Sequence, residues 1–566
     1  MAGVTLLTAC DNALNETDYT YSISSETFYN TVEEANAAVL APLDAMRSAY
    51  NSNFFATLEI NTEYCYPKGV YQTYKQYNGF VNATHMNRSD SNWQSLYKAI
   101  MFCNTAIERI PNATKMTEEE KLAYLGELRF LRGFNYFNLV KYWGGVPLKT
   151  DKNITEWNIP KSSKEEVYNF IIEDLKYALD NCPDKKRYLA TPDKNTVRVC
   201  LADVYMHTGD YIEAKKLSGE VVNSGTYQLV QVAEPRDFDK VFGADLTTST
   251  EEIFYIKTSR IDGKTWDYLS YTSHPKYEFV PGKTMLNGNG YYTHYTDLRN
   301  HIIKSWDTND LRYGMNIGFY VFGKDAYGEY TCLLTKYTDP NAQGNGANVS
   351  IPLIRYTDAM LIYSEACARV ANTPTMESIE MLNQLRRRAY GKDPKVPNAE
   401  LDYKLSDYAS MTAYMDLLLK EETYEHFNEA KHWDFIVRQG RAQELVGKYF
   451  NVETGEYTQI KKRHYLWKYQ TANSIITKQW IKLKIRIRVI PAPIKKEKDK
   501  FVTNQSRVTY ARDKTNQIYY EQKQIFKDII RSLHLHSLNL LRTKKRTETI
   551  TSTLLEYTKR YVVWTR

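Results

Sequence analysis

Several patterns that would assign a reaction or a membrane span are missing from this 566-residue sequence. Its seven cysteines form no CxxC pair, and HExxH, GxSxG and Walker patterns are absent, which excludes the familiar zinc, serine-hydrolase and phosphate-loop signatures. No run approaches roughly 18 uncharged apolar residues, so the sequence predicts no transmembrane helix. We therefore expect no catalytic residue, no metal ligand and no cofactor.

Glycine is absent from the last 99 residues, although average usage of about 7% predicts roughly seven there. This segment, residues 468–566, holds 23 basic and 7 acidic residues, whereas residues 1–467 hold 51 basic and 60 acidic ones. Folded domains need glycine at helix ends and turns. The net charge of +7 therefore comes from a C-terminal segment that is unlike the rest of the chain.

Helical periodicity dominates the first 230 residues. One stripe has spacings of 4, 3, 4 and 3, and consists of Trp93, Tyr97, Ile100, Asn104 and Ile107. The next helix is expected to begin at Thr117, with Glu120 completing a capping box, and to end at Gly144. Aromatic residues on these stripes are predicted to lie in the core: Trp93, Tyr97, Phe130, Tyr136 and Trp143.

Further amphipathic segments follow at residues 164–181, 195–208 and 211–224. The stretch LADVYMHTGDYIEAKKLSGEVVNSGTY resembles one tetratricopeptide unit. Such helix pairs bury their apolar faces only against stacked neighbours, so the sequence predicts a mostly α, tetratricopeptide-like helical-repeat scaffold.

The helical periodicity is lost between residues 226 and 350. Short β-like runs such as EEIFYIK alternate with tyrosines and with the loops NGNG and NAQGNGAN, before helical patterns return. We predict a helical frame at 30–225 and 351–440 that carries an irregular insert of loops and short strands at 226–350. Loops on a rigid scaffold commonly carry binding sites.

Three stretches have a recognisable pattern: ELRFLRGFNYFNLVKYWGGVPL, IRYTDAMLIYSEA followed by EMLNQLRRRAYG, and EETYEHFNEAKHWDFIVRQG. In this order they resemble the SusD/RagB family of nutrient-uptake outer-membrane lipoproteins, with Gly133 where alanine is usual and Asp358 in place of glutamate. Leu-Thr-Ala-Cys at residues 7–10 is similar to a lipobox, which predicts lipidation of Cys10 and makes residues 1–10 a truncated signal remnant. The expected SusD-like domain is residues 11–467.

This resemblance implies a function without catalysis. The protein would be a lipid-anchored subunit on the surface of the outer membrane of a Gram-negative bacterium. There it would capture oligosaccharide and act as a lid for a SusC-like TonB-dependent transporter, with no nucleic-acid partner. Two alternatives remain open: a soluble tetratricopeptide-type protein-interaction scaffold, and capture of peptide or glycoprotein fragments in place of glycan. A glycan-cleaving enzyme would instead need paired carboxylates in an aromatic cleft.

The family's ending, of the type Y-L-W-P-I-P-x-x-E-L with a final N-P-G-Y, is followed here only through Tyr465, Leu466 and Trp467. If one base was lost near codon 468, the original frame can be partly recovered by joining the third base of each codon to the first two bases of the next. The codons from Lys468 on are compatible with the hidden reading I-P-N-S-E-L-N-N-N-K-A-M-D-Q, and later with N-Q-N-P-G-Y. We therefore predict that residues 468–566 are a frameshifted, poorly ordered tail. The alternative is a genuine basic tail that binds RNA or anionic lipid.

Tyrosine-rich loops are the candidate ligand site. Glycans are held by exposed aromatic faces that stack on sugar rings, together with polar side chains that bond the hydroxyl rim. Two stretches offer this mixture, one before residue 80 and one in the insert. The candidate stacking residues are Tyr64, Tyr66, Tyr71, Tyr74, Tyr77, Trp266, Tyr268, Tyr271, Tyr291 and Tyr292.

Overall fold

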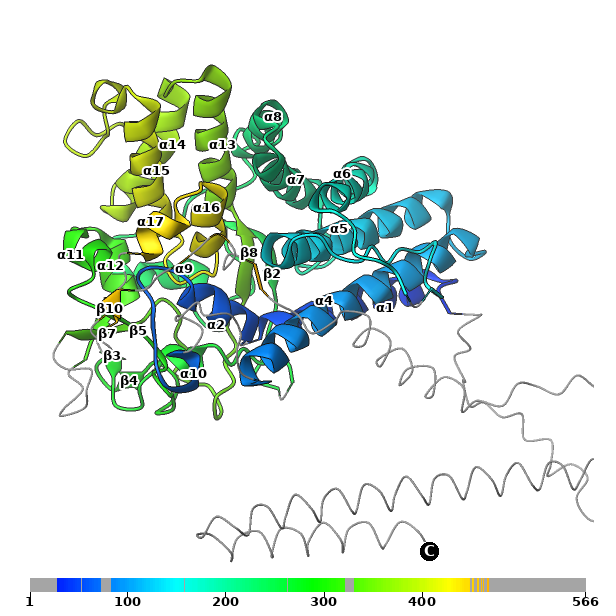
Figure 1. The fold of residues 1–566 in the computed structure, drawn as a ribbon, viewed down its shortest axis with the longest axis horizontal. Coiled ribbons are helices and arrows are strands. Elements are labelled where there is room, and N and C mark those ends of the chain that lie inside the picture. Colours follow the sequence, from blue (N-terminus) through cyan, green and yellow to red (C-terminus); the bar gives the residue numbers. More distant parts are fainter. Residues whose placement is uncertain are drawn as a thin grey trace, which may run out of the picture. The chain divides into compact units, whose positions relative to one another are not determined.

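The computed structural model describes residues between positions 28 and 467, which Figure 1 draws in colour. The described residues are 28–51, 53–72, 83–156, 158–261, 263–320, 330–447, 450–451, 456–457, 460, 462 and 466–467. Cys10, Tyr74, Tyr77 and the predicted tail from residue 468 lie outside them.

Long helices form the first layer of the frame. They are α1 (Val32–Tyr50), α2 (Asn53–Ile60), α4 (Ala83–Arg109) and α5 (Glu118–Trp143), and α4 packs against both α1 and α5. The predicted capping box is present, since the Thr117 side chain accepts from the Glu120 N–H and the Glu120 carboxylate accepts from the Thr117 N–H. The five aromatic residues predicted for the core are buried, as expected from their helical stripes.

Helical hairpins continue the scaffold. Helices α6 (Lys164–Asn181), α7 (Lys194–Thr208) and α8 (Tyr211–Val222) follow α5, and α8 packs on α13 (Tyr356–Ala371), although about 130 residues separate them (Figure 1). Gly209 ends α7 with φ +87°, a left-handed conformation that glycine adopts without strain. The remaining frame helices are α14 (Met376–Ala389), α15 (Met411–Glu425), α16 (His432–Arg438) and α17 (Ala442–Val446). The prediction of a mostly α, tetratricopeptide-like scaffold is confirmed.

Short elements fill the region between α8 and α13. The helices are η3 (Pro235–Phe238), α9 (Asp239–Phe242), α10 (Leu269–Thr272), α11 (His301–Ser305) and α12 (Leu311–Asn316). The strands are β2 (Glu252–Ile256), β3 (Glu278–Val280), β4 (Lys283–Thr284), β5 (His294–Asp297), β6 (Ile317–Phe319), β7 (Thr331–Leu334) and β8 (Ile351–Arg355). Outside this region lie β1 (Tyr66–Pro67), β9 (Phe450–Asn451), β10 (Glu456–Tyr457), η1 (Gly69–Tyr71), η2 (Ile110–Asn112) and η4 (Leu405–Tyr408).

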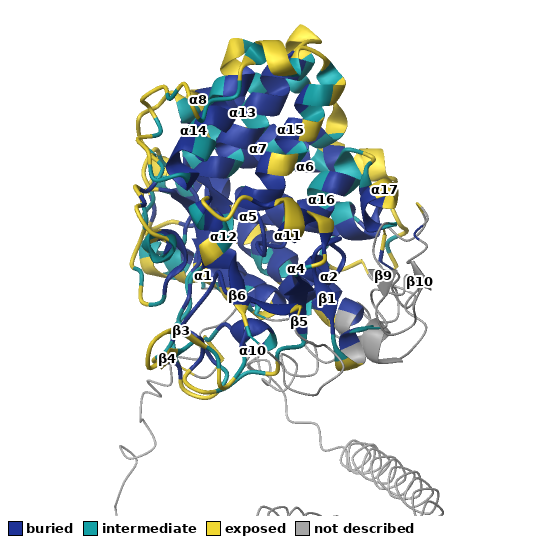
Figure 2. Cartoon of the chain, turned by 90° about the vertical axis from the view of Figure 1, so that its left-hand side faces the viewer, coloured by how far each residue is buried: buried dark blue, intermediate teal, exposed yellow. Residues whose placement is uncertain are grey.

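Two sheet contacts fasten these short elements to the frame. β2 pairs antiparallel with β8, which runs directly into α13, and Phe254 of β2 packs edge-on against Phe130 and Phe134 of α5 at ring distances of 5.3 and 5.5 Å. A four-stranded antiparallel sheet has the order β1-β5-β7-β6. The frame helices and the strands β2, β5, β7 and β8 are largely buried, whereas the loops around β3 and β4 are largely exposed (Figure 2).

A buried ion network joins the frame to the region of short elements. Arg355 binds Glu429 at 2.8 Å, Glu251 at 3.1 Å and Glu425 at 2.8 Å. Arg388 and Arg312 also bind Glu425, so three guanidinium groups surround one carboxylate. Burial alone would raise the pKa of Glu425, yet these cations hold it well below its ordinary value. Removing any member would leave an uncompensated charge in the core.

Among the described residues, no helix combines the length and the apolar character that crossing a bilayer requires.

Candidate ligand-binding face

The two tyrosine-rich stretches meet in space. β1 pairs antiparallel with β5, which sets Tyr66 opposite Tyr295 and Pro67 opposite His294. Beyond this pairing, the Tyr71 ring packs edge-on against Tyr271 at 5.3 Å. Both stretches were predicted to contribute to ligand binding. The fold brings them side by side although more than 200 residues separate Tyr66 from Tyr295 along the chain.

Five of the ten candidate stacking residues are buried, so the prediction that they stack on a ligand is corrected. Five residues are at most 7% exposed, and their rings face protein: Tyr64, Tyr66, Tyr71, Trp266 and Tyr268. Tyr64 stacks on Phe427 at 4.0 Å. Trp266 lies against Phe55 at 5.1 Å and donates its indole N–H to the Tyr50 carbonyl at 3.2 Å. A ring packed on all sides has no face to offer a sugar, so these five residues fix the loops in place.

Three candidates remain at the surface. Tyr291 is 51% exposed, and Tyr271 and Tyr292 are partly exposed beside it. The Tyr271 and Tyr291 ring centres are 6.4 Å apart with planes inclined by 50°. The Asn345 amide donates to the Tyr291 hydroxyl, which orients the ring. These rings, with amide groups around them, form the aromatic face, which we define as Tyr271, Tyr291, Tyr292 and Asn345.

Backbone contacts hold the aromatic face rigidly against α10. The Tyr291 N–H donates to the Ser270 carbonyl at 2.6 Å, and the Tyr292 N–H donates to the Ser273 carbonyl at 3.0 Å. Gly290 makes this approach possible, because a Cβ on it would lie 2.2 Å from the Ser273 oxygen and its φ is +140°. The final glycine of the NGNG loop therefore has a packing role.

The structure adds residues that the sequence did not single out. The Lys68 ammonium lies 3.5 Å from the centre of the Tyr292 ring, a cation–π contact, and the His274 ring lies 4.6 Å from the same ring. Asn345 comes from the NAQGNGAN loop, which was noted for its composition alone. No periodic pattern links these positions, because loops from three parts of the chain supply them.

The histidines near α15 are buried. His426 Nδ1 lies 3.3 Å from Glu422 one turn earlier, and His432 lies between Glu422 at 2.5 Å and Glu63 at 3.0 Å. Burial opposes the charge on His432, but the two carboxylates raise its pKa well above the ordinary value. The His432 contacts tie α15 to α16 and to the segment after α2 that contains Glu63.

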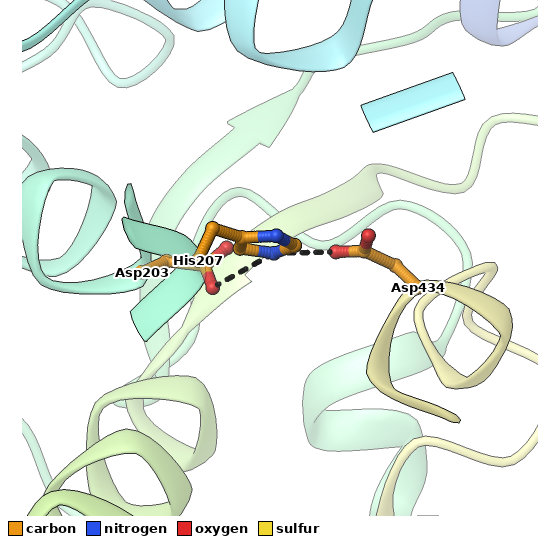
Figure 3. Close-up of side chains that lie close together, drawn as sticks. All are labelled: Asp203, His207 and Asp434. Atoms are coloured by element: carbon orange, nitrogen blue, oxygen red, sulfur yellow. Dashed lines mark hydrogen bonds and ion pairs between the residues drawn. The ribbon is translucent and has the colours of Figure 1, made fainter. Parts of the chain in front are cut away.

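A second cluster has the composition of a metal site. The His207 ring lies between the carboxylates of Asp203 and Asp434, at 3.8 and 3.2 Å from its Nε2 (Figure 3). The Lys141 ammonium, however, binds the same Asp434 oxygen at 3.1 Å. Although burial raises the pKa of Asp434, Lys141 and His207 hold it below its ordinary value. A metal ion would have to displace this ammonium, so the cluster joins α5, α7 and α16 as an ion pair.

Comparison with known proteins gives consistent matches along most of the chain. A family described as starch-binding and associating with the outer membrane matches residues 11–206, and the SusD family matches residues 199–498. A SusD-like protein of Formosa agariphila is 26% identical over 481 residues, covering 78% of this chain and 90% of that protein. One of Bacteroides ovatus is 25% identical over 493 residues, covering 79% and 83%.

Solved structures share the fold. A SusD homolog from Bacteroides thetaiotaomicron superposes with a TM-score of 0.67 at 19% identity, over 81% of this chain and 98% of that one. A laminarin-binding SusD-like protein superposes with a TM-score of 0.61 at 18% identity, over 80% and 98%. Since the SusD family match covers more than half of the sequence, the chain belongs to the SusD family.

Proposed function

We propose that the protein captures oligosaccharide on its aromatic face at the outer surface of the outer membrane and hands it to a SusC-like TonB-dependent transporter. Cys10 carries the lipid anchor in this proposal. The protein acts as a lid and catalyses no reaction, and energy for uptake comes from the transporter. Glycan recognition accords with family membership, because the matched families are starch-binding and SusD-like.

The exposed ring of Tyr291 is the observation that carries this proposal. Its hydroxyl is bonded to Asn345 and its backbone to Ser270, so it gains little further order on binding a sugar. A flat C–H face of a pyranose stacks on such a ring, while the exposed Gln343, two residues before Asn345, supplies an amide for the hydroxyl rim. Asn289 donates to the Gly344 carbonyl at 2.9 Å and so joins the two loops. Few contacts of this kind give weak, reversible binding, which release to a transporter requires.

Affinity electrophoresis tests the binding step. The purified chain should be retarded in gels that contain starch or laminarin, and no reducing sugar should appear over hours of incubation. Tyr291→Ala should weaken retardation by roughly fivefold, a typical loss for one stacking contact. Tyr188→Ala is the matched control, because Tyr188 is 49% exposed on the loop between α6 and α7 and should leave retardation unchanged.

Two outcomes would contradict the binding proposal. Release of reducing sugar would identify a glycan-cleaving enzyme, and equal retardation of both variants would place the ligand elsewhere. The transporter step has its own test, since extraction of outer membranes should copurify the protein with a TonB-dependent barrel. Cys10→Ala should remove the protein from the membrane fraction while leaving polysaccharide retardation intact.

A further inference from the structure

The charge around the aromatic face is opposite in sign to that of residues 1–467 as a whole, which hold 51 basic and 60 acidic residues. The stretches that carry or adjoin the face contain two lysines, Lys68 and Lys276, and no aspartate or glutamate. These stretches are residues 64–72, 268–277, 284–296 and 340–350. Lys276 is exposed and Lys68 is partly exposed. A ligand that approaches the face therefore meets positive charge.

Lys68 is fixed beside Tyr292 through both its backbone and its side chain. Its N–H donates to the Thr293 carbonyl at 2.7 Å, next to the pairing of β1 with β5. Its ammonium lies 3.5 Å from the centre of the Tyr292 ring. A cation over an aromatic ring is attracted by the negative face of the π system. Tyr292 therefore holds a positive charge at the aromatic face, one residue after the exposed ring of Tyr291.

His274 contacts the same tyrosine. Its ring lies 4.6 Å from the Tyr292 ring and 4.2 Å from the Tyr320 ring. The Lys276 N–H donates to His274 Nδ1 at 3.1 Å. A neutral imidazole that accepts at Nδ1 carries its proton on Nε2, so its other edge is a hydrogen-bond donor. The ammonium and the imidazole edge both favour a ligand group that accepts hydrogen bonds.

Five acidic residues stand at the ends of these stretches, and each has a partner of its own. Three form ion pairs at 2.6 to 3.0 Å: Glu63 with His432, Asp297 with Arg299 and Asp339 with Arg260. The other two accept hydrogen bonds at 2.9 Å, Asp267 from the Thr265 hydroxyl and Glu278 from the Gly282 N–H. Lys276 forms no ion pair with a described residue. The attraction of Lys68 for an anion acts through its charge and does not require that the ammonium lack other contacts.

We propose that Lys68, His274 and Tyr292 form an acid subsite, which binds the acidic group of a glycan, so that the preferred oligosaccharide carries carboxylates or sulfates. The inference rests on the proposed function and names its substrate class. A sugar that stacks on Tyr291 brings the neighbouring unit of the same glycan to the acid subsite. There the ammonium pairs with the carboxylate or sulfate in a charge-assisted hydrogen bond.

A neutral glycan would use this face less well. Sugar hydroxyls both donate and accept hydrogen bonds, so a site for neutral sugars gains as much from carboxylate acceptors as from cationic donors. The four stretches offer two ammonium groups and no carboxylate. This imbalance favours a ligand with negative charge, while stacking on Tyr291 is common to neutral and acidic sugars.

Matched polysaccharides with and without charge test the proposal in affinity gels of the full chain. One pair is polygalacturonate and its methyl ester, and the other is carrageenan and its desulfated form. Lys68→Met should weaken retardation by the charged member of one pair about threefold, the scale of one partly exposed ion pair. Retardation by the uncharged member should stay the same. Lys68→Arg keeps the charge and should restore the retardation. The pair that responds identifies the acidic group as a carboxylate or a sulfate.

Lys395→Met is the matched control. Lys395 is exposed on the loop after α14, outside the four stretches, and its replacement removes the same charge from the chain. Residues 468–566, with 23 basic and 7 acidic residues, attract any polyanion, but they do so equally in every variant. The difference between Lys68→Met and Lys395→Met therefore isolates the acid subsite.

Two results would overturn the acid subsite. Lys68→Met could behave like Lys395→Met in both charged gels, which would place the acidic group elsewhere or show that it is not recognised. Lys68→Met could instead weaken retardation by the charged and uncharged members equally, which would show that Lys68 only orients Tyr292. The proposed function fails on a different comparison, because it requires Tyr291→Ala to differ from Tyr188→Ala in the uncharged gels.

Discussion

The helical frame and the aromatic face use polar and aromatic side chains in opposite ways. Where the helical frame meets the region of short elements, Arg355 and Glu425 are buried, and each forms ion pairs with several partners. In the aromatic face, Tyr291 stays half exposed although its backbone and hydroxyl are both bonded. Charges in the frame therefore stabilise one arrangement of helices, whereas order in the face leaves a ring available for a ligand.

Breaking the buried network should have the largest effect. Glu425→Gln removes the charge that Arg312, Arg355 and Arg388 share, which leaves three guanidinium groups without their common carboxylate. We expect a loss of about 3–5 kcal/mol in the free energy of unfolding, measured by urea denaturation. Glu377→Gln, at an exposed pair with Lys215, is the control and should cost at most about 1 kcal/mol. Similar costs for both would contradict a special role for the network.

The second-largest effect is expected from pH, because the buried carboxyl group of Glu59 makes the stability of the helical frame depend on pH. Burial raises the pKa of Glu59 to about 7, and hydrogen bonds from Ala430 and Tyr64 offset this only in part. Between pH 4.5 and 7 the folded state keeps a proton that the unfolded chain releases. The free energy of unfolding therefore falls as pH rises through this window, by about 3 kcal/mol from this group. Glu59→Gln should remove that slope in urea titrations at several pH values, and an unchanged slope would contradict the assignment.

Two glycines of α5 are expected to differ in how much stability is lost when each is replaced by alanine, and both losses should be smaller than those above. A Cβ on Gly126 would lie 2.7 Å from the backbone nitrogen of Cys182, so Gly126→Ala should cost about 1–3 kcal/mol. A Cβ on Gly133 would meet the Leu175 side chain at 3.3 Å, which can adjust. Gly133→Ala should change stability by less than about 1 kcal/mol, because alanine favours the helix by about that amount. Thermal unfolding of both variants checks the order, and a costlier Gly133→Ala would contradict it.

The smallest effect on stability is expected at the aromatic face. Tyr291→Ala should change the free energy of unfolding by no more than about 0.5 kcal/mol, since half of the ring is in water. The same variant should weaken retardation by polysaccharide. Loss of stability together with binding would show that Tyr291 supports the loop and does not act as a ligand contact. Chemical denaturation alongside the affinity gel separates the two effects.

Local patterns were sufficient to predict the frame. The capping box at Thr117 and the buried stripe of Trp93 and Tyr97 both follow from residues fewer than ten positions apart. The same local reasoning failed for Trp266 and Tyr268, because an aromatic residue in an irregular segment has no periodic pattern that distinguishes burial from exposure. Their surroundings come from distant residues, Phe55 and Asn428 among them.

The sequence by itself determined the helical order, the resemblance to the SusD/RagB family and the change of composition after Trp467, because each is written in contiguous residues. Only the tertiary structure decided which tyrosines face solvent and which cations surround Glu425. These features depend on contacts between segments that lie up to several hundred residues apart, and no local pattern of apolar and polar residues specifies such contacts.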